Sequence, residues 1–497
     1  MEVSMLLLGA AAIVAAALVG AAGAAEAPKD LVASGDFAAG EGELPAAWKA
    51  WTPVCAGARA AVRKTSGGLL VESPKEPYGI GIVEQKLAGV RGGQAYAVEV
   101  AAELQGIAAP RQSVMVRLTW TRSKNPLHPA GMLVRGPQMS DAGANTAPPS
   151  PLAGEGPGVR GQQGQDATPP PATLTRLRHP LPSRERVEAK FADVLVAPAE
   201  ADGALLALEV KWPQGGTVLW KSATVRPTAP PPPRKVKVGT TYLRPKDSTP
   251  EKNLELFAAQ VDAAGKLGLD IVCLSEAITQ IGTGRTPADL AQPIPGPVSE
   301  RLGAAARKNR LWLVAGITER EGPRVYNTAV LLDRDGRLAG KYRKVHLPRE
   351  EWRQGITPGR EYPVFKTEFG TIAIQICYDW FFPEAEEIFA LQGAEILFAP
   401  TWGDTMADVD GRANGETVFR VRARDNGLYL VPAVYDGQSM IIDPMGRILT
   451  SNKGREGVFW AEIDLAAREC LPWVGHWRAI GPRDRMPDTY GPLIERK

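Results

Sequence analysis

The chain has 497 residues, more than one ordinary hydrophobic core accommodates, so two or three domains are expected. Its net charge of +3 at pH 7 is small for this length, and acidic and basic residues are interspersed, which argues against nucleic-acid binding. Four cysteines without CxxC spacing and four scattered histidines argue against a zinc site, a dithiol redox motif and a histidine-based metal centre. We therefore expect no metal and no other cofactor.

The N-terminus carries an apolar segment that is typical of export signals. Residues 5–25 are uncharged and end in the small residues Ala22, Gly23 and Ala24, as a signal-peptidase site requires. Glu2 stands where a basic residue is usual, and the segment is long enough to span a bilayer uncleaved. We predict that residues 1–25 form a signal peptide or an anchor, and that the protein is periplasmic or secreted.

Residues 31–225 show the pattern of an all-β domain. Polar and apolar residues alternate with period two over 69–72, 95–100, 113–120 and 204–212, and Gly and Pro clusters separate these stretches. Several such strands predict a β-sandwich. The opening Ser34-Gly35-Asp36-Phe37, followed by Pro45 and Trp48, resembles the start of carbohydrate-binding jelly-roll modules. That resemblance implies a glycan contact, whereas a spacer or packing role is the alternative that we favour.

Two stretches of biased composition interrupt the chain. Residues 136–186 are rich in Pro, Gly, Ala and Ser and almost free of aromatics, so they cannot bury enough apolar area to offset their ordering entropy. We interpret them as a disordered insertion in a surface loop of the sandwich. Residues 226–234 contain five prolines, which predicts a stiff linker and a domain boundary.

From residue 235 the pattern changes to alternating strands and helices, which predicts an α/β domain over 235–497. The segment 250–267 has apolar residues at helical spacing, with Thr249 as its N-cap and Pro250 in its first turn. Further helices are expected at 298–309, 384–392 and 415–426. Strands are expected at 236–240, 269–274, 311–316, 326–332, 371–376, 396–400, 428–434 and 439–442.

Three reactive side chains stand after or between strands of this domain. Cys377 ends the apolar run 371–376, Glu276 follows the strand 269–274, and Lys344 lies in a charged segment between them. A cysteine at a strand end is either a packed thiol or a nucleophile. A thiol that attacks an amide needs a base and an oxyanion donor. A nearby ammonium should lower the thiol pKa, and burial should raise that of the carboxylate.

Three motifs occur in the order found in one enzyme family. They are Leu274-Ser275-Glu276, Tyr342-Arg-Lys344-Val-His346-Leu-Pro348 and Ile376-Cys377-Tyr378-Asp379-Trp-Phe-Phe-Pro383-Glu384. Residues 235–497 thus resemble the nitrilase, or carbon-nitrogen hydrolase, superfamily. The resemblance implies a four-layer α-β-β-α sandwich that assembles into homodimers or larger homo-oligomers.

The resemblance also implies roles for individual residues. Cys377 would be the nucleophile, Glu276 the general base and acid, and Lys344 the stabiliser of the oxyanion. A second glutamate that holds the lysine would be Glu351, with the adjacent Glu350 as the alternative. Ser275 departs from the family pattern, in which proline precedes the base, but this change leaves the carboxylate in place.

Further residues around the motifs are expected to complete the pocket. The backbone N–H of Tyr378 would be the second oxyanion donor, and Trp402 is expected to line the pocket. His346 suggests a Cys–His protease, yet it lies within the matched lysine motif, so we assign it a structural role.

The sequence predicts a thiol hydrolase that cleaves a non-peptide carbon–nitrogen bond through a thioester intermediate. The substrate would be a small-molecule amide or carbamoyl amide, with a nitrile less favoured. One alternative is an N-acyltransferase of the same superfamily, in which an amine takes the acyl group. Another is a glycan-binding surface protein whose hydrolase domain is inactive.

Overall fold

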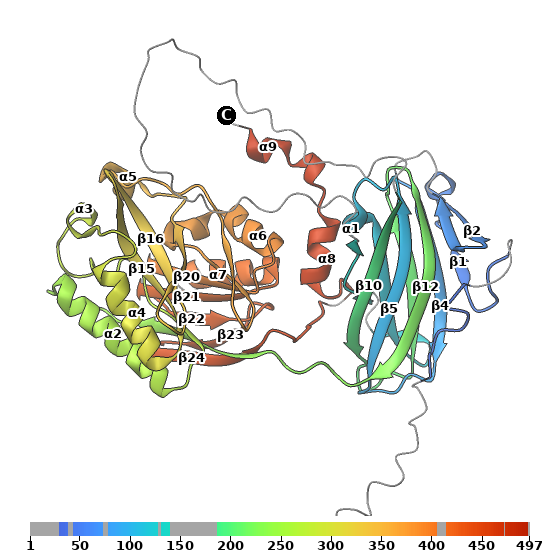
Figure 1. The fold of residues 1–497 in the computed structure, drawn as a ribbon, viewed down its shortest axis with the longest axis horizontal. Helices are drawn as coiled ribbons and strands as arrows, with labels where there is room; N and C mark the ends of the chain where they lie inside the picture. Colours follow the sequence, from blue (N-terminus) through green and yellow to red (C-terminus); the bar gives the residue numbers. More distant parts are fainter. Residues whose placement is uncertain are drawn as a thin grey trace, which may run out of the picture. The chain divides into compact units, whose positions relative to one another are not determined.

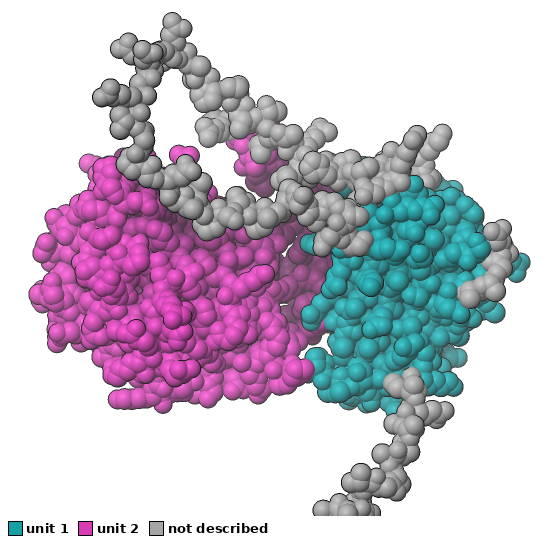
Figure 2. Space-filling model, viewed as in Figure 1, with its two compact units in different colours: residues 1–231 teal, residues 232–497 magenta. Residues whose placement is uncertain are grey.

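The computed structural model describes residues 29–37, 43–72, 78–127, 131–139, 186–404, 414–471 and 473–495. The predicted signal segment 1–25 lies outside this part, as does the predicted insertion except for 136–139 and Arg186. The chain divides into two compact units, residues 1–231 and 232–497, coloured separately in Figure 2. No helix within the described ranges is long and apolar enough to cross a membrane.

The described strands of the first unit form two antiparallel sheets. Their inner faces meet, for example, where Tyr96 of one sheet contacts Trp120 of the other at 5.7 Å between ring centroids. One sheet has the order β1 (Lys49–Trp51), β4 (Ile80–Ala88), β11 (Gly203–Lys211), β6 (Val114–Arg122) and β7 (Asn125–Pro126), with β8 (Met132–Leu133) on β6. The other has the order β2 (Ala61–Thr65), β3 (Gly68–Glu72), β12 (Thr217–Thr228), β5 (Ala95–Gln105), β10 (Arg186–Val196) and β9 (Gln138–Met139).

The all-β sandwich predicted for this region is confirmed. In β4 and β5 every second side chain is buried, as a strand with one face on a core requires. The short helix α1 (Pro110–Ser113) precedes β6. Strand β12 continues through Thr228, so residues 226–228 of the predicted linker belong to the sandwich, and β13 begins at Lys235.

The second unit contains two six-stranded mixed sheets, each with three adjacent parallel strands. The first has the order β17 (Leu338–Arg343), β16 (Arg324–Leu332), β15 (Trp312–Glu321), β14 (Ile271–Cys273), β13 (Lys235–Tyr242) and β24 (Gly457–Asp464). The second has the order β18 (Val364–Lys366), β19 (Thr371–Ile374), β20 (Ile396–Gly403), β21 (Tyr429–Asp436), β22 (Met440–Ile442) and β23 (Ile448–Ser451).

These sheets are stacked and covered by helices on their outer faces (Figure 1). Hydrogen bonds link the two sheets, from Thr240 Oγ1 to the carbonyl of Pro432 at 2.7 Å and from Ser439 Oγ to that of Thr241 at 2.8 Å. Helices α2 (Pro250–Lys266) and α4 (Pro297–Asn309) pack on the first sheet, and α6 (Pro383–Leu391) and α7 (Asn414–Asn426) on the second. The predicted four-layer α-β-β-α sandwich is confirmed.

Local sequence explains where the elements of this unit begin. Thr249 Oγ1 accepts a hydrogen bond from the N–H of Lys252 and Pro250 occupies the first turn of α2, as expected. Phe257 and Val261 on the buried face of α2 then join the core. The short helices of the unit are α3 (Pro287–Leu290), α5 (Arg349–Arg353), α8 (Trp477–Asp484) and α9 (Gly491–Ile494).

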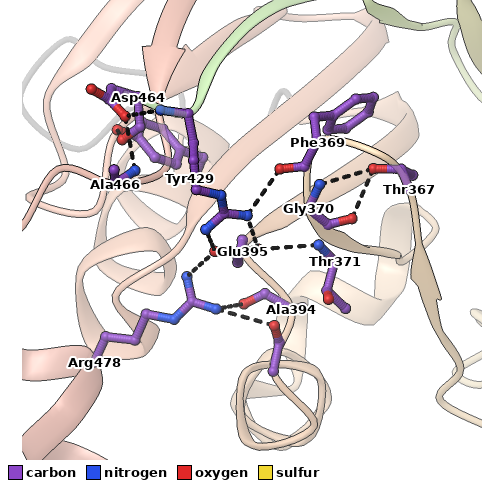
Figure 3. A network of polar contacts seen from close by, with 12 residues as sticks. Thr367, Phe369, Gly370, Thr371, Ala394, Glu395, Tyr429, Asp464, Ala466 and Arg478 are labelled. Atoms are coloured by element: carbon purple, nitrogen blue, oxygen red, sulfur yellow. Dashed lines mark hydrogen bonds and ion pairs between the residues drawn. The ribbon is translucent and has the colours of Figure 1, made fainter. Parts of the chain in front are cut away.

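A network of ion pairs and hydrogen bonds connects the segment before β13 and helix α8 to the turn between α6 and β20 (Figure 3). Arg234, just before β13, binds Glu395 with both terminal nitrogens, at 2.8 and 2.9 Å. Arg478 in α8 donates to the carbonyls of Gly393 and Ala394, at 3.1 and 2.9 Å. The linker exit and helix α8 are therefore connected to the turn before β20, in the sheet that ends next to Cys377.

Candidate active site

Cys377 lies in a sharp turn directly after strand β19. Its φ of +43° is in the left-handed region, which non-glycine residues seldom adopt and which is enriched at functional sites. A 3₁₀ helix, Cys377–Phe381, follows, and α6 begins at Pro383. The Asp379 carboxylate accepts the N–H of Ile376 at 2.9 Å, which holds the turn. The strand thus holds the thiol at a fixed position beyond the C-terminal end of β19.

Asp379 also connects this turn to the lysine motif. Its carboxylate accepts the hydroxyl of Tyr342 at 2.7 Å and the backbone N–H of His346 at 3.0 Å. The His346 ring lies with Nδ1 2.9 Å from Asp379 and stacks on Phe382 at 3.9 Å. His346 therefore faces Asp379 and Phe382, which agrees with a structural role.

Lys344 is buried between two glutamates. Its ammonium donates to Oε1 of Glu276 at 2.9 Å and to Oε1 of Glu351 at 2.7 Å. Lys344 is 1% exposed and Glu276 2% exposed, so the pair is shielded from water. Glu350 is exposed on the solvent side of α5, and the second glutamate at Lys344 is therefore Glu351.

Asn327 on β16 contacts both glutamates and was not identified from the sequence. Its Nδ2 donates to Oε1 of Glu276 at 2.6 Å and to Oε1 of Glu351 at 3.0 Å. Its backbone carbonyl accepts the N–H of Lys344 at 2.9 Å. The sequence signal was one amide side chain in a strand whose following residues, apart from Thr328, are apolar.

Trp402 at the end of β20 approaches the site with its backbone. Its N–H donates to Oε2 of Glu276 at 2.6 Å. The indole is 38% exposed and contacts Tyr435 edge-on at 5.3 Å. That the Trp402 side chain lines the pocket stays a prediction, and the backbone contact was not anticipated.

The thiol of Cys377 hydrogen-bonds the carboxylate of Glu276 and the backbone of Trp402. Burial, and next the charge of Glu276, raise the pKa of Cys377 to about 12, although Lys344 lowers it. Lys344 lowers the thiol pKa, as expected, but burial and the charge of Glu276 outweigh this effect.

The two other members of the cluster also have displaced pKa values. Burial favours neutral Lys344, yet the charges of Glu276, Cys377 and Glu351 outweigh it and raise the lysine pKa. Burial, together with the charge of Glu276, raises the pKa of Glu351 to about 7 against the opposing effect of Lys344. The ammonium is therefore charged at every physiological pH, while Glu351 titrates near neutrality.

Tyr378 follows the cysteine in the first turn of the 3₁₀ helix, where a backbone N–H has no acceptor within the helix. Its ring packs on Phe381 and Phe382 at 4.8 and 5.4 Å. No cluster of His, Cys, Asp and Glu suited to a metal ion occurs in the described part of the chain.

Comparison with known proteins places this site in a family. The family described as carbon-nitrogen hydrolase matches residues 237–471. Omega-amidase NIT2 of Mus musculus is 31% identical over 233 residues, which cover 43% of this chain and 83% of that protein. The chain belongs to the carbon-nitrogen hydrolase family. It is thus an enzyme of the nitrilase superfamily, as the motifs predicted.

Other relatives of this carbon-nitrogen hydrolase have similar coverage. Deaminated glutathione amidase of Rattus norvegicus is 33% identical over 50% of this chain and 82% of its own length. A nitrilase of Pyrococcus abyssi is 32% identical over 46% of this chain and 90% of its own. A solved carbon-nitrogen hydrolase from Helicobacter pylori G27 aligns with a TM-score of 0.46 and 25% identity, covering 53% of this chain and 99% of that one.

Proposed function

We propose that this hydrolase cleaves the carbon–nitrogen bond of a small-molecule amide through a thioester on Cys377. The observation that carries the proposal is the buried set of Glu276, Lys344 and Glu351, with the Glu276 carboxylate hydrogen-bonded to the thiol. The same arrangement favours an active hydrolase domain over an inactive one, because burying three charged groups without a chemical task is costly.

The first half of the reaction forms the acyl-enzyme. Cys377 Sγ attacks the amide carbon while Glu276 takes the thiol proton, and the carbonyl electrons move to the oxygen. When the oxyanion collapses, the C–N bond breaks and Glu276 passes its proton to the leaving nitrogen. Ammonia or an amine departs, and a thioester remains.

The second half regenerates the enzyme. A water molecule attacks the thioester carbon and gives a proton to Glu276, which produces a second oxyanion. Its collapse breaks the C–S bond, and the sulfur recovers the proton from Glu276. The acid is released, and the resting thiol is restored.

Charge explains why a base must act during the attack. With a pKa of about 12 the thiol is neutral at rest, so proton transfer to Glu276 has to accompany C–S bond formation. Lys344 remains charged beside the developing oxyanion, and the Tyr378 N–H supplies a second donor. Glu351 holds the ammonium in place.

The names of the relatives favour an amide over a nitrile, since two of the three proteins compared above are called amidases. The acyltransferase alternative keeps the same acyl-enzyme and differs only in the acceptor. Export, a homo-oligomeric state and a glycan contact of residues 31–225 stay predictions from the sequence.

The test is a panel of small amides, carbamoyl compounds and nitriles, with release of ammonia or amine as the readout. Mass spectrometry of the Cys377 peptide should show an acyl adduct whose mass identifies the substrate. Added hydroxylamine should compete with water only slightly; predominant transfer to amines would favour the acyltransferase. Turnover by Cys377→Ala equal to wild type would overturn the proposal.

A further inference from the structure

We propose that Asn327 is a positioning residue. It fixes Oε1 of Glu276 and Oε1 of Glu351, and it leaves Oε2 of Glu276 as the atom that takes the proton. This inference rests on the proposed function, since Glu276 acts as the base there. It concerns a side chain to which the motifs assign no role.

The amide of Asn327 has one stable orientation. Its Nδ2 carries two hydrogens, and the two carboxylates accept one each. The reversed amide would place Oδ1 against two carboxylate oxygens, which is repulsive. Strand β16 lies between β15 and β17 and holds the residue from both sides, so the amide is a rigid bridge.

The bridge leaves the two oxygens of Glu276 unequal. Oε1 accepts hydrogen bonds from Lys344 and Asn327, which occupies both of its lone pairs. Oε2 accepts one, from the N–H of Trp402, and retains a lone pair for a proton. The thiol proton therefore goes to Oε2, the oxygen on the β20 side.

Asn327 also keeps the cluster ionised. Asn327 contacts Glu276 after β14 and Glu351 in α5, and both carboxylates bind Lys344 after β17, while the neutral thiol of Cys377 after β19 lies against Glu276. A hydrogen bond to a carboxylate favours its charged form, and the bond from Asn327 lowers the pKa of Glu351 against the effect of burial. Without it a proton enters the cluster at higher pH and weakens the hold on Lys344.

The experiment compares Asn327→Leu with Thr328→Val as the matched control. Thr328 is the next residue of β16, is fully buried, and donates to Oε2 of Glu319 at 2.8 Å. Asn327→Leu removes two hydrogen bonds to carboxylates and Thr328→Val removes one, on the same strand. The readout is the pH dependence of carbamidomethylation of Cys377 by iodoacetamide, quantified on its peptide, with kcat/KM for an amide as the second readout.

We expect Asn327→Leu to react roughly 10- to 100-fold more slowly near neutral pH, with the acidic limb of its profile moved up by about one pH unit. Thr328→Val should retain the wild-type limb. Should Asn327→Leu fail to fold, the near-isosteric Asn327→Asp replaces it. Its added carboxylate should slow the reaction increasingly as pH rises.

A wild-type profile in folded Asn327→Leu or Asn327→Asp, or an equal limb shift in Thr328→Val, would overturn the inference. The alkylation readout needs no substrate, so it separates the two proposals. A shifted limb without amide turnover contradicts the proposed function alone, and amide turnover with an unshifted limb contradicts the role of Asn327 alone.

Discussion

The interiors of the two units differ in charge. Among the described residues of the sandwich, the residues that are polar and buried as a whole are Gln85, Ser113 and Thr119; the shielded carboxylate of Asp193 is paired with Arg135 at 3.4 Å. The described hydrolase unit buries Lys344 and several carboxylates, Glu276 and Glu386 among them. Because burying an unpaired charge costs several kcal/mol, an interior without charges is the expected outcome of folding alone. Of the buried charges of the second unit, Lys344 and Glu276 belong to the candidate active site, whereas Glu386 lies outside it and pairs with Arg422.

The largest effect expected is on catalysis. Glu276→Gln keeps the shape of the side chain but removes the proton acceptor, so kcat/KM for an amide should fall roughly 10³- to 10⁴-fold. Glu209→Gln, at a half-buried carboxylate of the sandwich, should leave kcat/KM unchanged. If kcat/KM fell by a similar factor in both variants, the buried charges around Glu276 would not be the site of the reaction.

The next effect is on stability. Lys344→Met leaves Glu276 and Glu351 buried without a cation, so the free energy of unfolding should fall by about 3 to 5 kcal/mol at pH 8. Urea denaturation followed by fluorescence measures it. The loss should shrink at pH 5, where burial keeps Glu351, with its pKa of about 7, protonated. A pH-independent loss would show that packing, and not charge, dominates.

A third test concerns a buried carboxylate outside the reaction. Burial raises the pKa of Glu386 to about 8, although Arg422 Nε lies 3.6 Å from its Oε2. The folded state then holds a proton that the unfolded chain, with a glutamate pKa of about 4.3, releases. The stability gained is complete below about pH 4 and is lost as pH rises to about 8.

Glu386→Gln removes this titration. Relative to wild type, the variant should gain on the order of 4 kcal/mol in unfolding free energy between pH 5 and pH 8, measured by urea denaturation at each pH. Its amide turnover should stay at the wild-type level. A difference between the two proteins that does not change with pH would show that Glu386 is ionised in the folded state throughout this range.

Motif order and strand patterns predicted much of this molecule. Strand alternation predicted the sandwich. Cys377, Glu276 and Lys344 stand in short local motifs that can be recognised from the sequence alone. The choice between Glu350 and Glu351 depended on the rotation of α5, which begins at Arg349 and turns Glu350 to solvent. That rotation follows from tertiary packing, so the sequence left both open.

Other features depend on contacts between distant segments. Asn327 reaches Glu276 across 51 positions of sequence, and nothing in its strand indicates which residue lies opposite. The N–H of Trp402 belongs to the backbone and therefore has no residue signature. The sequence indicated the effect of Lys344 on the thiol pKa but not the opposing effect of burial, which is larger and is a property of the folded cluster.

The smallest effect belongs to the sandwich. Arg117 and Glu209 form a two-point ion pair at 2.8 and 3.1 Å, with side chains 22% and 13% exposed. Water reaches both side chains of this pair, whereas Lys344 is fully buried, so Arg117→Gln should cost about 1 to 2 kcal/mol, and less in 1 M salt. Urea denaturation at two salt concentrations measures this against Lys344→Met, whose loss should hardly respond to salt. Equal losses would show that burial does not set the energetics of ion pairs in this chain, and that the contrast between the two interiors is one of composition only.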